Sequence, residues 1–188
     1  MENEKRRGQA KTLRLFRKIH RTLGMCLFVV FVFVSLTGLL LGWKKNSNGM
    51  ILPKSYEGTS TDLKEWLPID SLHKNACSIL LDSVSPDLSL ELERIDMRPD
   101  KGMVKFVFVD NYIGIQIDCA TGKLLHIETR NSDFIENIHD GSILDYLFKT
   151  EKEQFKLVYT SIVGLSLFMF TVTGFWLWFG PKRMRRKK

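Results

Sequence analysis

An uncharged stretch of 21 residues, from Leu23 to Trp43, constrains this chain more than any other feature of its sequence. At a rise of about 1.5 Å per residue, a helix of that length covers roughly 30 Å, the thickness of the hydrocarbon core of a bilayer. A cleaved signal peptide is the alternative, but its apolar region is usually about 7–15 residues long. The segment also ends in Gly42-Trp43-Lys44-Lys45, without a small-x-small cleavage pattern. The sequence therefore predicts a retained transmembrane helix over residues 23–43.

A second uncharged stretch, from Leu157 to Phe179, predicts a second membrane helix over residues 155–179. Tyr159 lies near one end and Trp176 near the other, as expected for aromatic residues at the two membrane interfaces. Pro181 follows and is expected to end the helix, because proline has no backbone N–H to donate. We expect the two spans to be antiparallel.

The charge is distributed unevenly along the 188 residues, whose net charge is +7. Residues 1–22 contain eight Lys or Arg and two Glu, and the last seven residues contain six bases and no acid. Residues 44–156 contain 14 bases and 19 acids. Basic residues next to the outer ends of two apolar segments indicate cytoplasmic termini, so residues 1–22 and the tail 180–188 are predicted in the cytoplasm. Lipid headgroups, not nucleic acid, are the expected anionic partner.

The segment between the spans is long enough for one small domain, which we expect in the periplasm over residues 62–130 after a polar linker over 44–61. Asp70 or Ser71 can cap a helix through residues 72–82, and three runs of alternating apolar residues follow. One sheet face is expected to pack on this helix. Its members are Val104, Phe106, Phe108, Ile113, Ile115 and Ile117. The predicted fold is an α+β membrane protein, in which two antiparallel transmembrane helices flank a helix and a three-stranded antiparallel sheet.

Two further patterns concern the membrane. Residues 131–154 contain apolar residues at helical spacing and predict an amphipathic helix at the outer interface. The spans also resemble each other, since SLTGLLLGWKK closes the first and TVTGFWLWFGPKR closes the second, a weak inverted repeat. Gly38 with Gly42, and Gly164 with Gly174, form low-bulk tracks that pack helices either within one chain or between chains.

Several motifs resemble known families. The turn Asp118-Cys119-Ala120-Thr121-Gly122-Lys123 is similar to the last hairpin of the PepSY domain. The motifs His20-Arg21-x-x-Gly24, Leu36-Thr37-Gly38, His139-Asp140-Gly141 and Val172-Thr173-Gly174-Phe175-Trp176 resemble the PepSY-associated transmembrane helix family over residues 17–180. Members with four or more spans include inner-membrane reductases for ferric siderophores, in which membrane histidines ligate haem b. The resemblance therefore implies haem b and a role in iron uptake. This chain departs from those members in having two spans.

Two histidines are candidate ligands of haem iron. His20 lies one turn before Gly24, where the missing side chain leaves room for a flat macrocycle, and Arg17, Lys18 and Arg21 are available to propionates. The alternative is that His20 is an interfacial residue among basic side chains. His139 precedes the second span on the outer side. His73 and His126 have no residue at ligand spacing and are predicted to be surface residues.

Because His20 and His139 are expected at opposite membrane faces, one iron cannot bind both. We therefore expect a haem-binding form to be a homodimer, pairing His20 with His20 and His139 with His139, or part of a larger complex.

The chain has no recognisable catalytic motif and no glycine-rich dinucleotide loop, so a flavin or NAD(P)H donor would belong to another protein. Cys77 and Cys119 are both expected in an oxidising compartment, where a disulfide between them is an open alternative.

Two functions follow from these patterns. One is a haem-binding electron-transfer subunit linked to iron or siderophore uptake or reduction. The other is a haem-free, membrane-anchored PepSY module that binds a periplasmic protein or peptide.

Overall fold

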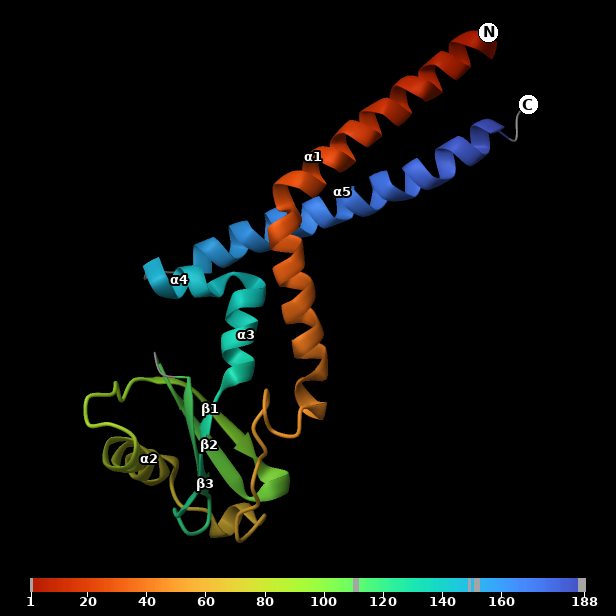
Figure 1. The fold of residues 1–188 in the computed structure, drawn as a ribbon. Coiled ribbons are helices and arrows are strands. Elements are labelled where there is room, and N and C mark those ends of the chain that lie inside the picture. Colours follow the sequence, from red (N-terminus) through yellow and green to blue (C-terminus); the bar gives the residue numbers. More distant parts are fainter. Residues whose placement is uncertain (1, 110–111, 149, 151–152, 186–188) are drawn as a thin grey trace. The chain divides into compact units, whose positions relative to one another are not determined.

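The computed structural model describes residues 2–109, 112–148, 150 and 153–185. The chain forms two compact units, which are treated separately below. The membrane unit combines Met1–Leu39 with Asn137–Lys188, and the other unit, named the outer unit after its position expected from the sequence, is Leu40–Glu136. Figure 1 gives the order of their helices and strands along the chain.

Both predicted membrane helices are present. α1 (Glu2–Trp43) and α5 (Gln154–Arg185) are long and apolar enough to cross a bilayer. α1 bends partway along its length (Figure 1) and includes the basic segment before the first apolar stretch. The expectation that Pro181 ends the second helix is wrong, because α5 continues to Arg185 with the proline inside it. Pro181 lacks the N–H that would donate to Leu177 O, and the helix nevertheless continues for about one more turn. The last three residues of the basic tail lie outside the described residues.

The expected amphipathic segment consists of two short helices, α3 (Asn131–Asp140) and α4 (Ser142–Phe148), instead of one. Gly141 separates them with a φ of +81°, in the left-handed region that favours glycine. A Cβ at this position would lie 2.6 Å from the ring of Tyr159, so any larger residue would also collide with α5. The segment therefore turns sharply between its two helices.

The carboxylate of Asp145 in α4 forms hydrogen bonds with the start of α5. The two oxygens of Asp145 accept hydrogen bonds from the backbone N–H groups of Phe155, at 3.0 Å, and Lys156, at 2.7 Å, and from the hydroxyl of Thr150. Burial by itself would raise the pKa of Asp145, but these hydrogen bonds lower it below its usual value. Asp145 thus provides acceptors to the first free N–H groups of α5.

The outer unit contains a four-stranded antiparallel sheet in the order β1-β2-β3-β4. Its strands are β1 (Leu92–Arg98), β2 (Met103–Phe108), β3 (Ile113–Asp118) and β4 (Leu124–Thr129). The expected third strand is in fact two, because the chain turns back between Asp118 and Lys123, where Gly122 has a φ of +69°. The α+β class is as predicted, with one more strand than expected.

The predicted packing of helix and sheet is confirmed. α2 (Ile69–Ser83) places its buried residues against the alternating apolar face of β2 and β3, and Phe106 and Phe108 are fully buried there. The cap prediction is wrong, since Pro68 occupies the N-cap position of α2 without a side-chain hydrogen bond. Asp70 lies in the first helical turn instead, where its negative charge interacts favourably with the positive end of the helix dipole.

Residues 54–61, here called the strap, are part of the outer unit and not a free linker. The fully buried side chain of Gln116 donates to Lys54 O at 2.9 Å and accepts from Tyr56 N at 3.0 Å. Gly58 N donates to Lys101 O at 2.8 Å, beside the β1–β2 turn. A cross-strand ion pair between Lys105 and Glu128, 2.7 Å long, lies next to Gln116. The strap therefore covers the polar face of the sheet.

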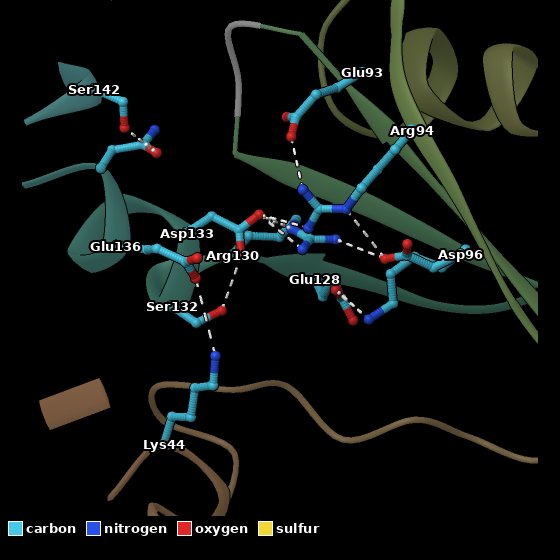
Figure 2. A network of polar contacts seen from close by, with 12 residues as sticks. Lys44, Glu93, Arg94, Asp96, Glu128, Arg130, Ser132, Asp133, Glu136 and Ser142 are labelled. Carbon is cyan, nitrogen blue, oxygen red and sulfur yellow. Dashed lines mark hydrogen bonds and ion pairs between the residues drawn. The ribbon is translucent and has the colours of Figure 1, made fainter. Parts of the chain in front are cut away.

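A cluster of charged residues joins the sheet to the start of α3 (Figure 2). The guanidinium groups of Arg94 and Arg130 both contact Asp133 Oδ2, at 2.8 and 2.7 Å, and both face Asp96. Arg130 is only 6 % exposed, so its charge requires these carboxylates as partners. The cluster fixes the point at which the chain leaves the sheet.

The three cysteines of the chain are all free. Burial raises the pKa of Cys77, and burial together with the nearby charge of Asp118 raises that of Cys119 to about 11. Both thiols are therefore protonated at neutral pH and behave as small apolar groups.

Candidate functional site

His20 lies between the two membrane helices and forms a polar contact with α5. Its Nδ1 is 3.0 Å from Oγ1 of Thr173, a side chain that is completely buried. The imidazole ring also stacks on Phe170, with 3.8 Å between the ring centroids. Phe179, the last large apolar residue of α5 before the basic tail, is six positions beyond Thr173, about 9 Å along the helix. His20 is thus placed beside the apolar part of α5.

His139, near the end of α3, makes the corresponding contact with α1. Its Nδ1 is 2.9 Å from Oγ1 of Thr37, which is 8 % exposed. Each of the two threonines is followed by a glycine, and a Cβ on Gly38 or Gly174 would lie 3.3 Å from Cε1 of the histidine. The same His–Thr–Gly arrangement therefore occurs twice in the membrane unit, once on each helix.

The hydrogen bonds of the threonines determine which histidine nitrogen carries the proton. Thr37 Oγ1 is 2.7 Å from Phe33 O, and Thr173 Oγ1 is 2.7 Å from Met169 O. Two oxygen atoms approach this closely when a proton lies between them, so each hydroxyl donates to its own helix. The hydroxyl has no second proton and must accept from the histidine Nδ1–H. In a neutral imidazole, Nε2 then carries the lone pair that can bind a metal.

The other residues expected around His20 are distributed differently. Arg17 and Arg21 are exposed on α1, one on each side of the histidine in sequence. Gly24 is covered by the ring of Phe170, since a Cβ there would lie 3.2 Å from Phe170 Cε2. The place expected for a flat ligand is thus filled by an aromatic ring. Phe170 and Gly24 also line an open apolar groove that continues along α1 past Phe31 and Ser35.

The structure does not bring His20 and His139 together. Their threonine partners are on different helices, and Thr37 is 17 positions beyond His20 along α1, at most about 26 Å. Among the residues that the structure describes, no three His, Cys, Asp or Glu side chains form a metal-binding group. Each histidine could therefore supply one nitrogen ligand to a haem iron, and a macrocycle placed against Gly24 would have to displace the ring of Phe170.

The glycines of the low-bulk tracks have two different environments. Gly38 and Gly174 face the histidines, whereas a Cβ on Gly42 or Gly164 would have no atom within 4 Å. The first two glycines make space for imidazole rings, and the other two leave open surface on the helices.

The two remaining histidines belong to the outer unit and are partly exposed. His73 stacks on Phe106, with ring centroids 5.6 Å apart, and its Nε2 is 3.2 Å from Sγ of Cys77. His126 packs against Tyr56 of the strap, with 4.8 Å between the centroids. Both rings are packing elements of the outer unit.

Thr37 and Thr173 are the site residues that the sequence reasoning missed. The repeated Thr-Gly pair was visible at the end of each span, but its partners are 102 and 153 positions away in the chain. The available signal was that the sequence has two Thr-Gly pairs and one candidate histidine for each, His139 for Thr37-Gly38 and His20 for Thr173-Gly174.

One protein family matches a segment of the chain that includes both long helices and the outer unit. The family model of the PepSY-associated TM region matches residues 17–188. The chain belongs to this family. No curated protein and no solved structure matches it. Membership of the PepSY-associated TM region family and the two long apolar helices together make this a membrane protein.

Proposed function

We propose that this member of the PepSY-associated TM region family is a haem b-binding subunit of an electron-transfer path across a bacterial inner membrane. The termini would lie in the cytoplasm and the outer unit in the periplasm, in agreement with the basic ends of the chain. The electrons would serve the uptake or reduction of iron bound to siderophores. An electron donor and an acceptor would be separate proteins, since the chain carries no dinucleotide-binding loop.

The observation that carries this proposal is the pair of His–Thr contacts. A histidine whose Nδ1–H is held by an oxygen acceptor has a fixed tautomer and ring orientation, as in many metal sites. His20 and His139 would each bind iron through Nε2, Thr173 and Thr37 would orient the rings, and Gly174 and Gly38 would give the rings space. Arg17 and Arg21 would hold propionates. Haem, when bound, supplies reversible one-electron transfer.

The number of histidines argues for a dimer or a larger complex. Each site has one imidazole, and a bis-histidine site would take the second from another chain. A two-fold dimer would supply this at both membrane faces, pairing His20 with His20 and His139 with His139. Gly42 and Gly164, which border open space, are suitable places for close approach between helices of two chains.

The test is to change each histidine to alanine and to measure haem per chain in the detergent-purified protein. His20→Ala and His139→Ala should each remove about half of the bound haem and leave the oligomeric state unchanged. His126→Ala, in the outer unit, is the control and should keep all of it.

Two results would contradict the proposal. One is full haem retention by both single variants, and the other is a haem-loaded monomer by light scattering. A wild-type protein that stays colourless after expression with a haem precursor would instead favour the haem-free module that binds a periplasmic protein or peptide.

A further inference from the structure

A second pocket of the membrane unit lies between α1 and α5, at the end that carries the two termini. Its α1 side consists of Gly8, Gln9, Thr12 and Leu13, and its α5 side includes Trp176 and Arg183. The helices touch on its border, because a Cβ on Gly180 would lie 3.1 Å from Leu13 Cδ1. Phe16 and Trp176 close the inner side with an edge-to-face contact, 6.0 Å between centroids. None of these residues belongs to the His–Thr–Gly sites.

The pocket is amphipathic along the direction of the helices. Trp176 lies within the uncharged stretch of α5, which ends at Pro181, and Arg183 lies two positions beyond that end. Gln9 and Thr12 add polar side chains, whereas Leu13 adds an apolar one. The pocket therefore crosses the level at which α5 changes from apolar to basic. This distribution of polarity matches a molecule with a charged head and a hydrocarbon chain.

The charge around the pocket is mainly positive, and Glu4, one helical turn before Gly8 on α1, is the acidic residue nearest in sequence to its lining. The chain contains no acidic residue between Glu4 and Glu57, and none from Trp176 to its end. Arg7, Lys11 and Arg14 are exposed on α1 next to the pocket residues. Lys182 lies over the ring of Trp178 at 4.0 Å, so it is directed to a different aromatic side chain from the one that lines the pocket. Arg183 is thus the cation that lines the pocket itself.

We propose that this pocket is a binding site for one anionic phospholipid. The phosphate would contact Arg183, Gln9 and Thr12, and an acyl chain would lie along Leu13 and Trp176. Basic pockets between membrane helices on the cytoplasmic side have the charge that such headgroups require. The proposal is independent of haem binding, since it shares no residue with the histidine sites.

The experiment uses the full chain in detergent and native mass spectrometry, with phosphatidylglycerol and phosphatidylcholine of the same acyl chains as probes. The wild type should retain phosphatidylglycerol in preference to phosphatidylcholine. Arg183→Gln should weaken phosphatidylglycerol binding about fivefold, the factor that corresponds to about 1 kcal/mol for one basic residue near a lipid surface. Lys182→Gln makes the same change of charge one position away and should alter binding less than twofold.

A second variant tests the pocket without changing charge. Gly8 lines the pocket and a Cβ on it would have no atom within 4 Å, so Gly8→Leu can be accommodated, adds bulk at the pocket wall and should also weaken binding. Equal losses from Arg183→Gln and Lys182→Gln would overturn the proposal, because they would indicate a diffuse charge effect. Wild-type binding by both Arg183→Gln and Gly8→Leu would overturn it too. Displacement of the lipid by millimolar inorganic phosphate would show a phosphate site and not a lipid site.

Discussion

Thr37 Oγ1 and His139 Nδ1 are 2.9 Å apart although the residues are 102 positions apart in the chain. The contact is repeated by Thr173 and His20, at 3.0 Å across 153 positions. In both pairs the threonine donates to a carbonyl of its own helix and precedes a glycine that faces the imidazole. The weak inverted repeat of the sequence therefore corresponds to a repeated side-chain arrangement.

If His20 and His139 bind haem as proposed, removing either threonine hydroxyl should weaken haem binding at the histidine that it contacts. Thr37→Val and Thr173→Val keep the side-chain shape and delete the acceptor for Nδ1–H. Loss of such a partner typically costs about 10–100-fold in metal affinity. Haem titration of the purified variants, followed at the Soret band, measures the loss.

Thr171→Val is the matched control for this test. The Thr171 hydroxyl also donates to its own helix, at 2.9 Å from Leu167 O, but it contacts no histidine. The haem affinity of the Thr171→Val protein should equal that of the wild type. An equal loss in all three variants would mean that the hydroxyls act on helix structure and not on the imidazoles.

Gly38→Ala and Gly42→Ala should differ, although both add one methyl group to the same helix. At position 38 the methyl would lie 3.3 Å from His139 Cε1, whereas at position 42 it would meet nothing within 4 Å. For the haem proposed at His139, we expect Gly38→Ala to shift the midpoint potential or the spectrum, and Gly42→Ala to leave both unchanged. Identical spectra for the two variants would remove the assigned role of Gly38.

Phe106→Asp should unfold the outer unit. Phe106 is fully buried among α2 and the sheet, and a charge there costs several kcal/mol, comparable to the stability of a small domain. Urea unfolding of the isolated segment 44–136, which includes the strap, is the measurement. Met97→Asp introduces the same charge at a side chain that is 47 % exposed and should change stability far less. A cooperative wild-type-like transition for Phe106→Asp would mean that the assigned sheet face is wrong.

Asp118 should stabilise the outer unit at neutral pH and lose this effect in acid. Burial alone would raise its pKa, but hydrogen bonds from Thr59, Thr121 and the backbone N–H of Ala120 lower it to about 2. Protonation is therefore easier in the unfolded chain. The stabilisation is complete above the unfolded pKa, about 4, and is lost as the pH falls through the folded pKa.

Asp118→Asn should lower the free energy of unfolding at pH 7 by about 1.5–3 kcal/mol, the usual value for hydrogen bonds to a charged group. The difference from the wild type should shrink below about pH 4, be mostly lost near pH 2 and disappear below it. Asp100→Asn, at an exposed position in the β1–β2 turn, should have little effect at either pH. A difference that is constant with pH would show that charge is not the cause.

Reporter enzymes fused at residues 1 and 188 test the topology. Reporters that require the cytoplasm should be active at both ends, because basic residues next to membrane helices stay on that side. Activity of export-dependent reporters at both ends would reverse the assignment of the outer unit to the periplasm.

The sequence was sufficient where one local pattern determines the structure. Uncharged length predicted both spans, and the alternation around Phe106 predicted which sheet face packs on α2. The sequence was insufficient where the hydrogen-bond partner of a residue is distant along the chain. The Gln116 side chain that fixes the strap, and the threonines that hold His20 and His139, depend on contacts that periodicity does not encode. The cap of α2 and the helical Pro181 show that local preferences yield to tertiary context.

The two ends of the outer unit lie close together and contact each other. Lys44 Nζ is 3.9 Å from Glu136 Oε2, and Asn131 Nδ2 donates to Met50 O at 2.9 Å. A domain whose entry and exit are adjacent can be inserted into a host chain, or removed from it, without separating the flanking segments. The sheet and α2 could therefore be deleted as one block. A short turn joining residues 46 and 131 would then connect the helices that carry both His–Thr pairs.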